Sequence, residues 1–175
     1  MAFTVRLATL ADSTHIAKLG AEVFTVTFGH SVPPDELEAY LKDTYTVPAV
    51  TTLLEDPTKR TFVATDNENR VVGFAIMAYG TRKPCIEDVQ STIELQRVYV
   101  DTAVHGKGIG FMLARRIEKE AQEQGYRNIW LSVWEEHNSG HKAYQRWGYN
   151  HVGYDVFTVG TVVQRDHIMM KAVQE

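Results

Sequence analysis

The stretch Val104–Leu113, VHGKGIGFML, places a glycine at every second position: Gly106, Gly108 and Gly110. Apolar residues then recur every four positions, which is typical of the buried face of a helix: Ile109, Leu113, Ile117 and Ala121. The N-terminus of a helix carries unpaired N–H groups and a partial positive charge, and glycines before it let several N–H groups converge on one anion. Lys107 adds a cation inside the loop. The stretch therefore predicts a cradle for a phosphate or pyrophosphate.

Two common phosphate-binding patterns do not fit this loop. A dinucleotide-binding G-x-G-x-x-G motif requires a third glycine where the chain has Phe111 or Leu113. A P-loop requires Ser or Thr after its lysine, and Lys107 is followed by Gly108. The other interpretation is a glycine-rich turn that merely joins a strand to a helix.

The flanking sequence predicts a single mixed α/β domain over residues 1–175. Alternating or continuous apolar runs predict strands over residues 3–8, 60–65, 71–79, 93–100, 128–133, 153–159 and 165–172. Helical patterns run from a Thr9–Asp12 cap to about residue 28, from Pro34 through Leu41, over 47–54, from 109 to before Gly125, and over 139–147. Residues 81–92 are expected to form a polar loop.

Composition excludes several classes of protein. A net charge of −4 and a pI of about 6.0 argue against a general nucleic-acid binder. The single cysteine, Cys85, rules out an intrachain disulfide and fits a reducing compartment. No apolar run approaches the roughly 20 residues that span a bilayer, and no signal peptide is recognised. We therefore expect a cytoplasmic protein with no membrane or nucleic-acid partner.

The glycine stretch resembles the acetyl-CoA signature of the GNAT superfamily of N-acetyltransferases, Gln/Arg-x-x-Gly-x-Gly/Ala after a strand and before a helix. Here it reads His105-Gly-Lys-Gly-Ile-Gly110, with His105 in place of Gln or Arg. A second segment, Asn-x-x-Ala-x-x-Phe-Tyr-x-x-x-Gly-Phe in the family, reads HNSGHKAYQRWGY over residues 137–149. His137 stands at the position of the family's Asn, and Asn138 follows one place later, so either one is a candidate for the pantetheine contact.

The resemblance implies the GNAT fold: a mixed, mostly antiparallel twisted sheet of six to seven strands flanked by helices. Two central parallel strands would splay apart to admit acetyl-CoA, the cosubstrate. The residues that the resemblance assigns to acetyl-CoA binding are Val98, Tyr99, Val100, His105, Gly106, Lys107, Gly108, Ile109, Gly110, His137, Asn138 and Tyr144. His137 and His141 lie four apart with no apparent third ligand, so no metal is expected.

Two residues are candidates for proton transfer. Glu94 begins the central strand at an offset similar to that of the base glutamate in the superfamily's histone acetyltransferases, and a carboxylate amid apolar strands would have a raised pKa. Strand alternation would put Glu94, Gln96, Val98 and Val100 on one face. Tyr144 is the expected acid for the leaving thiolate, because its phenol stays protonated at neutral pH. The alternatives are a surface ion pair for Glu94 (with Glu87 and Asp88 as substitute bases) and simple packing for Tyr144.

The resemblance implies transfer of acetyl to a primary amine by direct attack in a ternary complex. Similarity to PaiA-type spermidine/spermine N-acetyltransferases in the segments EVFTVTF, NIWLSVWEE and HIMMKAV makes a polyamine one candidate acceptor. A peptide or protein amine is the alternative acceptor. A non-catalytic acyl-CoA-binding sensor is the alternative from another class. The resemblance is also compatible with a homodimer.

Overall fold

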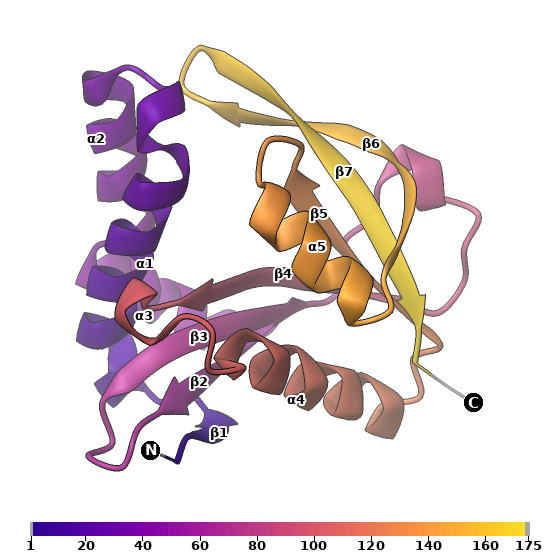
Figure 1. The fold of residues 1–175 in the computed structure, drawn as a ribbon, viewed down its shortest axis with the longest axis horizontal. Helices are drawn as coiled ribbons and strands as arrows, with labels where there is room; N and C mark the ends of the chain where they lie inside the picture. Colours follow the sequence, from indigo (N-terminus) through magenta and orange to yellow (C-terminus); the bar gives the residue numbers. More distant parts are fainter. Residues whose placement is uncertain (1, 174–175) are drawn as a thin grey trace.

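The computed structural model describes residues 2–173 and is built on a seven-stranded sheet (Figure 1). The strands lie in the order β1-β2-β3-β4-β5-β7-β6. Their bounds are β1 Thr4–Leu7, β2 Lys59–Thr65, β3 Val71–Ala78, β4 Thr92–Val100, β5 Asn128–Trp134, β6 Asn150–Val159 and β7 Val162–Ala172. Neighbouring strands are antiparallel except for the parallel pair β4 and β5. The predicted mostly antiparallel sheet with a central parallel pair is confirmed.

In the part of the chain that the structure describes, five α-helices cover the two faces of this sheet. They are α1 Ser13–Phe28, α2 Pro34–Thr44, α3 Val47–Glu55, α4 Ile109–Glu123 and α5 Asn138–Arg146. The first three pack on one face, and α4 and α5 lie on the other (Figure 1). All five helices were expected from the sequence, with bounds that differ by a few residues.

Strand β3 shows how the two cores form. Ala75 and Met77 pack in the core beneath α4, whereas Phe74 and Ile76 pack in the core beneath α1. All four side chains are 0 % exposed. Because helices cover both faces, this strand has no polar face, and its sequence is a continuous apolar run.

The C-terminal strands start earlier than the sequence predicts. β6 begins at Asn150 rather than residue 153, and β7 begins at Val162 rather than residue 165. The added residues are mostly exposed, so burial does not impose an apolar alternation on them. A tight turn at Gly160, whose φ is +57°, joins the two strands.

The turn of this hairpin reaches across to α2 (Figure 1). The backbone N–H of Thr161 donates to Glu36 at 3.0 Å, and the Thr161 hydroxyl donates to the same carboxylate at 2.6 Å. The hairpin and α2 are thereby joined although they lie 125 residues apart in the chain.

The loop at residues 81–92 is more structured than its polar sequence suggests. Pro84–Ile86 form a 3-10 turn, and Ile86 is 2 % exposed, packed with Trp130 and Ile168. A second 3-10 turn, Thr102–Val104, joins β4 to the glycine loop.

Candidate active site

The central parallel strands separate soon after they pair. Their ladder has only three pairs, Thr92 with Asn128, Ile93 with Ile129 and Glu94 with Trp130. Beyond Glu94 the two strands continue without pairing to each other. The expected splay of the central parallel strands is therefore present.

A β-bulge lies just beyond the last of these pairs. Ile76 of β3 pairs with Arg97 and Met77 pairs with Leu95, which leaves Gln96 as an extra residue of β4. The bulge reverses the alternation, because Leu95 and Val98 both pack in the core beneath α4. The expectation that Glu94, Gln96, Val98 and Val100 share one face is therefore wrong.

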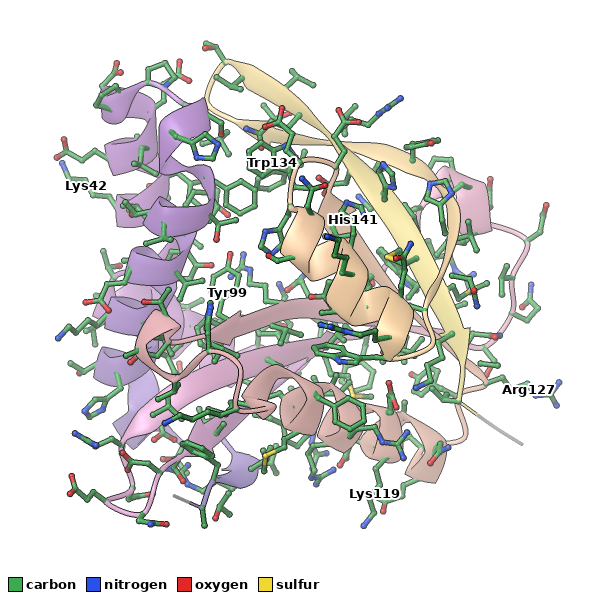
Figure 2. The ribbon with its side chains drawn as sticks, in the orientation of Figure 1. Lys42, Tyr99, Lys119, Arg127, Trp134 and His141 are labelled. Atoms are coloured by element: carbon green, nitrogen blue, oxygen red, sulfur yellow. The ribbon has the colours of Figure 1, made fainter. Side chains whose placement is uncertain are left out.

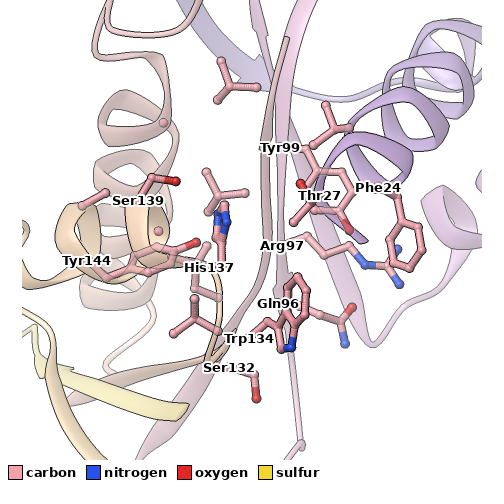
Figure 3. A pocket seen from close by; sticks show the side chains of 18 of the residues that line it. Phe24, Thr27, Gln96, Arg97, Tyr99, Ser132, Trp134, His137, Ser139 and Tyr144 are labelled. Carbon is pink, nitrogen blue, oxygen red and sulfur yellow. The ribbon is translucent and has the colours of Figure 1, made fainter. Parts of the chain in front are cut away.

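A cavity of about 920 Å³ opens between the splayed strands and reaches both faces of the sheet. Figure 3 shows Tyr144 and Ser139 on the side of α5, and Arg97, Thr27 and Phe24 on the side of α1. Eleven of the residues singled out from the sequence line it: Glu94, Val98, Tyr99, Val100, His105, Gly106, Gly108, Ile109, Gly110, His137 and Tyr144. Lys107 and Asn138 are exposed and are not among its lining residues.

The glycine loop forms one end of this cavity. Gly106 and Gly108 both have φ of +78°, a left-handed conformation that disfavours other residues, and Gly108 immediately precedes α4. The His105 ring nitrogen Nε2 lies 2.9 Å from the Val100 carbonyl oxygen and so ties the loop to β4. Gly110 lets α4 approach α5, since a β-carbon there would lie 3.2 Å from the Trp147 ring. The open backbone N–H groups at this helix start suit a pyrophosphate.

Tyr144 extends from α5 toward the gap between the strands (Figure 3). Its ring packs edge-on against Trp147, with centroids 5.2 Å apart. Burial is the main cause that raises the pKa of Tyr144 above its usual value. Its hydroxyl makes no hydrogen bond to another residue of the described chain, 2–173. The phenol is therefore protonated at neutral pH and its proton is free to be donated into the cavity.

Glu94 lies where the cavity meets the last strand pair. Its side chain is 7 % exposed. Burial raises its pKa, opposed by the Thr81 hydroxyl and then by the charge of Lys83. A raised pKa suits a base that must accept a proton near neutrality. The alternative bases Glu87 and Asp88 are exposed and do not line the cavity.

His137 and Gly140 depart together from the family pattern, and the structure shows why. A β-carbon on Gly140 would overlap Cδ2 of the His137 ring and lie 2.8 Å from its Nε2. The larger side chain at 137 thus occupies the space that an alanine at 140 would need. Burial lowers the pKa of His137, followed by the charges of His141 and His105, so the ring is neutral at pH 7. His137, not Asn138, lies in the cavity wall.

The acceptor half, which we define as the part of the cavity on the α1 side of β4, contains residues that sequence reasoning missed. Arg97 and Asp166 both line the cavity. Oδ1 of Asp166 is buried without a hydrogen-bond partner among residues 2–173, and burial is the main cause that raises the pKa of this carboxyl to about 6. Five aromatic residues complete the wall: Phe24, Phe28, Tyr40, Trp134 and Phe157. A charged residue inside a strand is a weak sequence signal, because most such residues are solvated.

The described range, residues 2–173, holds neither a metal cluster nor a membrane-spanning helix. No group of three or more His, Cys, Asp and Glu residues in that range is arranged to hold a metal ion. No helix in that range combines the length and apolar character needed to cross a membrane.

The known proteins that this chain resembles are acetyltransferases. The family model "Acetyltransferase (GNAT) family" matches residues 22–149. An uncharacterised N-acetyltransferase of Mycobacterium bovis is 21% identical over 162 residues, covering 93% of this chain and 98% of its own. The streptothricin acetyltransferase of Streptomyces lavendulae is 31% identical over 118 residues, covering 66% of this chain and 58% of its own.

Solved structures show the same fold. The PaiA N-acetyltransferase of Thermoplasma acidophilum, determined in complex with coenzyme A, superposes with a TM-score of 0.77 at 18% identity and covers 98% of this chain and 99% of its own. An N-acetyltransferase of Staphylococcus aureus superposes with a TM-score of 0.75 at 20% identity over 99% of this chain and 100% of its own. The chain therefore belongs to the Acetyltransferase (GNAT) family and is an acetyltransferase whose acetyl donor is acetyl-CoA.

Proposed function

We propose that the protein transfers the acetyl group of acetyl-CoA to a small primary amine by direct attack in a ternary complex. The observation that carries this proposal is the continuous cavity that runs between the splayed strands. The glycine loop and Tyr144 line it on one side of β4, and the acceptor half lies on the other (Figure 3). Donor and acceptor thus meet in one space, with no need for an acetylated residue of the enzyme.

Each side of the cavity has a defined task. When bound, acetyl-CoA supplies the acetyl group as a thioester. The backbone N–H groups at Gly106–Ile109 bind its pyrophosphate, and a β4 backbone N–H near Val98 polarises the thioester carbonyl. The neutral ring of His137 takes the pantetheine contact that the family assigns to asparagine.

Two side chains move protons in this scheme. An aliphatic amine has a pKa of about 10 and arrives protonated, so Glu94 accepts a proton from it, directly or through a water. The nitrogen then bonds to the acetyl carbon as the carbon–sulfur bond breaks. Tyr144 donates its proton to the departing sulfur, and the second proton that the nitrogen loses on forming the amide returns through water to the Tyr144 phenolate.

The acceptor half favours a small molecule over a peptide. A peptide acceptor would need an open groove for its extended chain. The hydrogen bonds from Thr161 to Glu36 instead join the β6–β7 hairpin to α2 at the place where such a groove would lie. A polyamine, the candidate that the PaiA resemblance suggests, is supported by the carboxylates of Glu94 and Asp166. The guanidinium of Arg97 in the same half opposes a polycation. We therefore propose a small primary amine, with spermidine and spermine as members of the test panel.

The test is release of CoA thiol from acetyl-CoA by the purified protein, measured against polyamines, other small amines, amino acids and basic peptides. We expect Glu94→Gln and Tyr144→Phe each to lower kcat by about 10²- to 10⁴-fold, the usual contribution of a positioned acid or base. Glu123→Gln and Tyr126→Phe are matched controls, because neither residue lines the cavity. Tight CoA binding without thiol release for any amine would support the sensor and contradict the enzyme.

A further inference from the structure

The bulge at Gln96 places a base and a cation on the same face of β4. In a regular strand Glu94 and Arg97, three residues apart, would point to opposite faces. The bulge inserts one residue between them, and Val98 and Leu95 then share the face toward α4. Glu94 and Arg97 therefore share the other face, the α1 side, on which Figure 3 shows Arg97.

Arg97 has no anionic partner among residues 2–173. No carboxylate of residues 2–173 lies within 4.0 Å of its guanidinium, and it donates no hydrogen bond to any of those residues. Its aromatic neighbour is Tyr45, whose ring centroid lies 5.5 Å from Cζ. The five N–H donors of its guanidinium thus border the cavity without an acceptor from the described part of the chain.

The two lysines near Glu94 and Gln96 are already engaged. Lys83 forms an ion pair with Asp155, and Lys59 donates to the side-chain oxygen of Gln96 at 2.9 Å. Glu94 itself forms no ion pair with a residue of the described range. A buried region normally pairs its charges, because an unpaired charge loses hydration without compensation. Arg97 is therefore the cation left for a ligand.

We propose that Arg97 binds a carboxylate of the acceptor, so that the substrate is an amino-acid-like primary amine with an apolar side chain. This inference rests on the proposed function and names its substrate class. A planar guanidinium pairs with a carboxylate through two parallel hydrogen bonds. An α-amino acid carries its amine next to that carboxylate, and Arg97 and Glu94 line one cavity from one face of β4 without forming an ion pair with each other.

The rest of the acceptor half suits an apolar side chain. Phe24, Phe28, Tyr40 and Phe157 form connected ring pairs with centroids 4.3 to 6.3 Å apart. Trp134 adds to this wall, 5.1 Å from the Phe28 ring. A hydrated polyamine chain would gain little binding free energy on such a surface, whereas an aromatic or aliphatic side chain would bind to it well.

The experiment compares acceptors that differ only in the carboxylate. Thiol release from acetyl-CoA is measured with phenylalanine and with phenethylamine, each at several pH values so that the fraction of neutral amine is taken into account. We expect kcat/KM to favour phenylalanine in the native protein. Arg97→Gln should lower kcat/KM for phenylalanine by about 10- to 100-fold, the range for losing a hydrogen-bonded charge partner, and change it by less than about threefold for phenethylamine.

Three controls make the result specific. Arg127→Gln removes an exposed arginine at the far end of the molecule and should change neither substrate (Figure 2). Arg97→Lys should recover only part of the preference, because an ammonium lacks the paired donors of a guanidinium. Thermal unfolding of Arg97→Gln checks that the variant is folded. Equal losses for both substrates, or a native preference for phenethylamine or spermidine, would overturn the inference.

A binding measurement separates this inference from the proposed function. Trp134 lies in the cavity wall, so quenching of tryptophan fluorescence in the presence of CoA follows acceptor binding without turnover. If no amine is acetylated but phenylalanine binds and Arg97→Gln weakens it tenfold or more, the proposed function fails and the carboxylate site stands. If phenethylamine is acetylated and phenylalanine neither reacts nor binds, the carboxylate site fails and the proposed function stands.

Discussion

Gly140 and His137 provide a quantitative test of the packing at the start of α5. A methyl group on Gly140 would overlap the His137 ring, with 2.8 Å to Nε2. Overpacking of this kind costs about 1–3 kcal/mol of stability. Replacing a helical glycine by alanine otherwise gains about 1 kcal/mol. Gly140→Ala should therefore lower the free energy of unfolding by between 0 and about 2 kcal/mol in the native background.

Gly140→Ala should have the opposite effect on the free energy of unfolding once the His137 ring is removed. His137→Ala eliminates the three atoms that the new methyl group would meet, Cδ2, Nε2 and Cγ. Gly140→Ala should then raise the free energy of unfolding by about 1 kcal/mol. The expected coupling between the two sites is about 1–3 kcal/mol, within the range found for residues in contact.

The coupling is measured by urea unfolding of four proteins: the native protein, Gly140→Ala, His137→Ala and the double variant. Unfolding is followed by far-UV circular dichroism at one pH. The m-values of the four proteins should agree, which shows that they unfold from comparable native states. If Gly140→Ala stabilises the protein equally with and without the ring, the two sites are independent. That result would refute the argument that the two departures from the family pattern compensate each other.

Three further predictions concern charge and backbone conformation. Because burial raises the pKa of Glu94, the acidic limb of kcat/KM should lie above the ordinary glutamate value of about 4.3, and Glu94→Gln should remove it from the pH profile. Asp166 has a folded pKa of about 6 against about 3.9 unfolded, so the folded protein loses stability as pH rises through this window. Asp166→Asn should remove that loss and raise the free energy of unfolding at pH 8 by about 1–3 kcal/mol, with no gain below pH 4. Gly108→Ala strains a residue at φ of +78°, so calorimetry should show weaker CoA binding by about tenfold; unchanged affinity would contradict the cradle.

The helix after the glycine loop and the central strands could be predicted because burial imposes a period on them. Ile109, Leu113 and Ile117 are at most 1 % exposed, and their spacing follows from the one face that α4 buries. The glycine loop could also be predicted, because a positive φ at Gly106 and Gly108 restricts these positions to glycine in most proteins. The strand ends at residues 150–152 and 162–164 were missed because most of their side chains are exposed.

The acceptor half could not be predicted from the sequence. The bulge at Gln96 has no glycine or proline to mark it, so regular alternation assigned the wrong face to half of β4. In the sequence Arg97 is one cation within a strand and Asp166 lies between Arg165 and His167, so neither residue is marked by its neighbours. Their shared cavity depends on how far β4 and β5 diverge, which depends on contacts between distant parts of the chain.

The short ladder between β4 and β5 has a consequence for the cohesion of the whole molecule. Strands β1–β4 come from one continuous stretch of chain and strands β5–β7 from the next, and the two half-sheets share only three residue pairs. In the proposed ternary complex, a donor molecule seated in the gap touches both halves at once and acts as a noncovalent cross-link between them. Because it binds only when both halves are in place, its binding free energy adds directly to their mutual attachment. For this enzyme, donor binding and the attachment of the two halves of the sheet are thermodynamically linked, so that each strengthens the other.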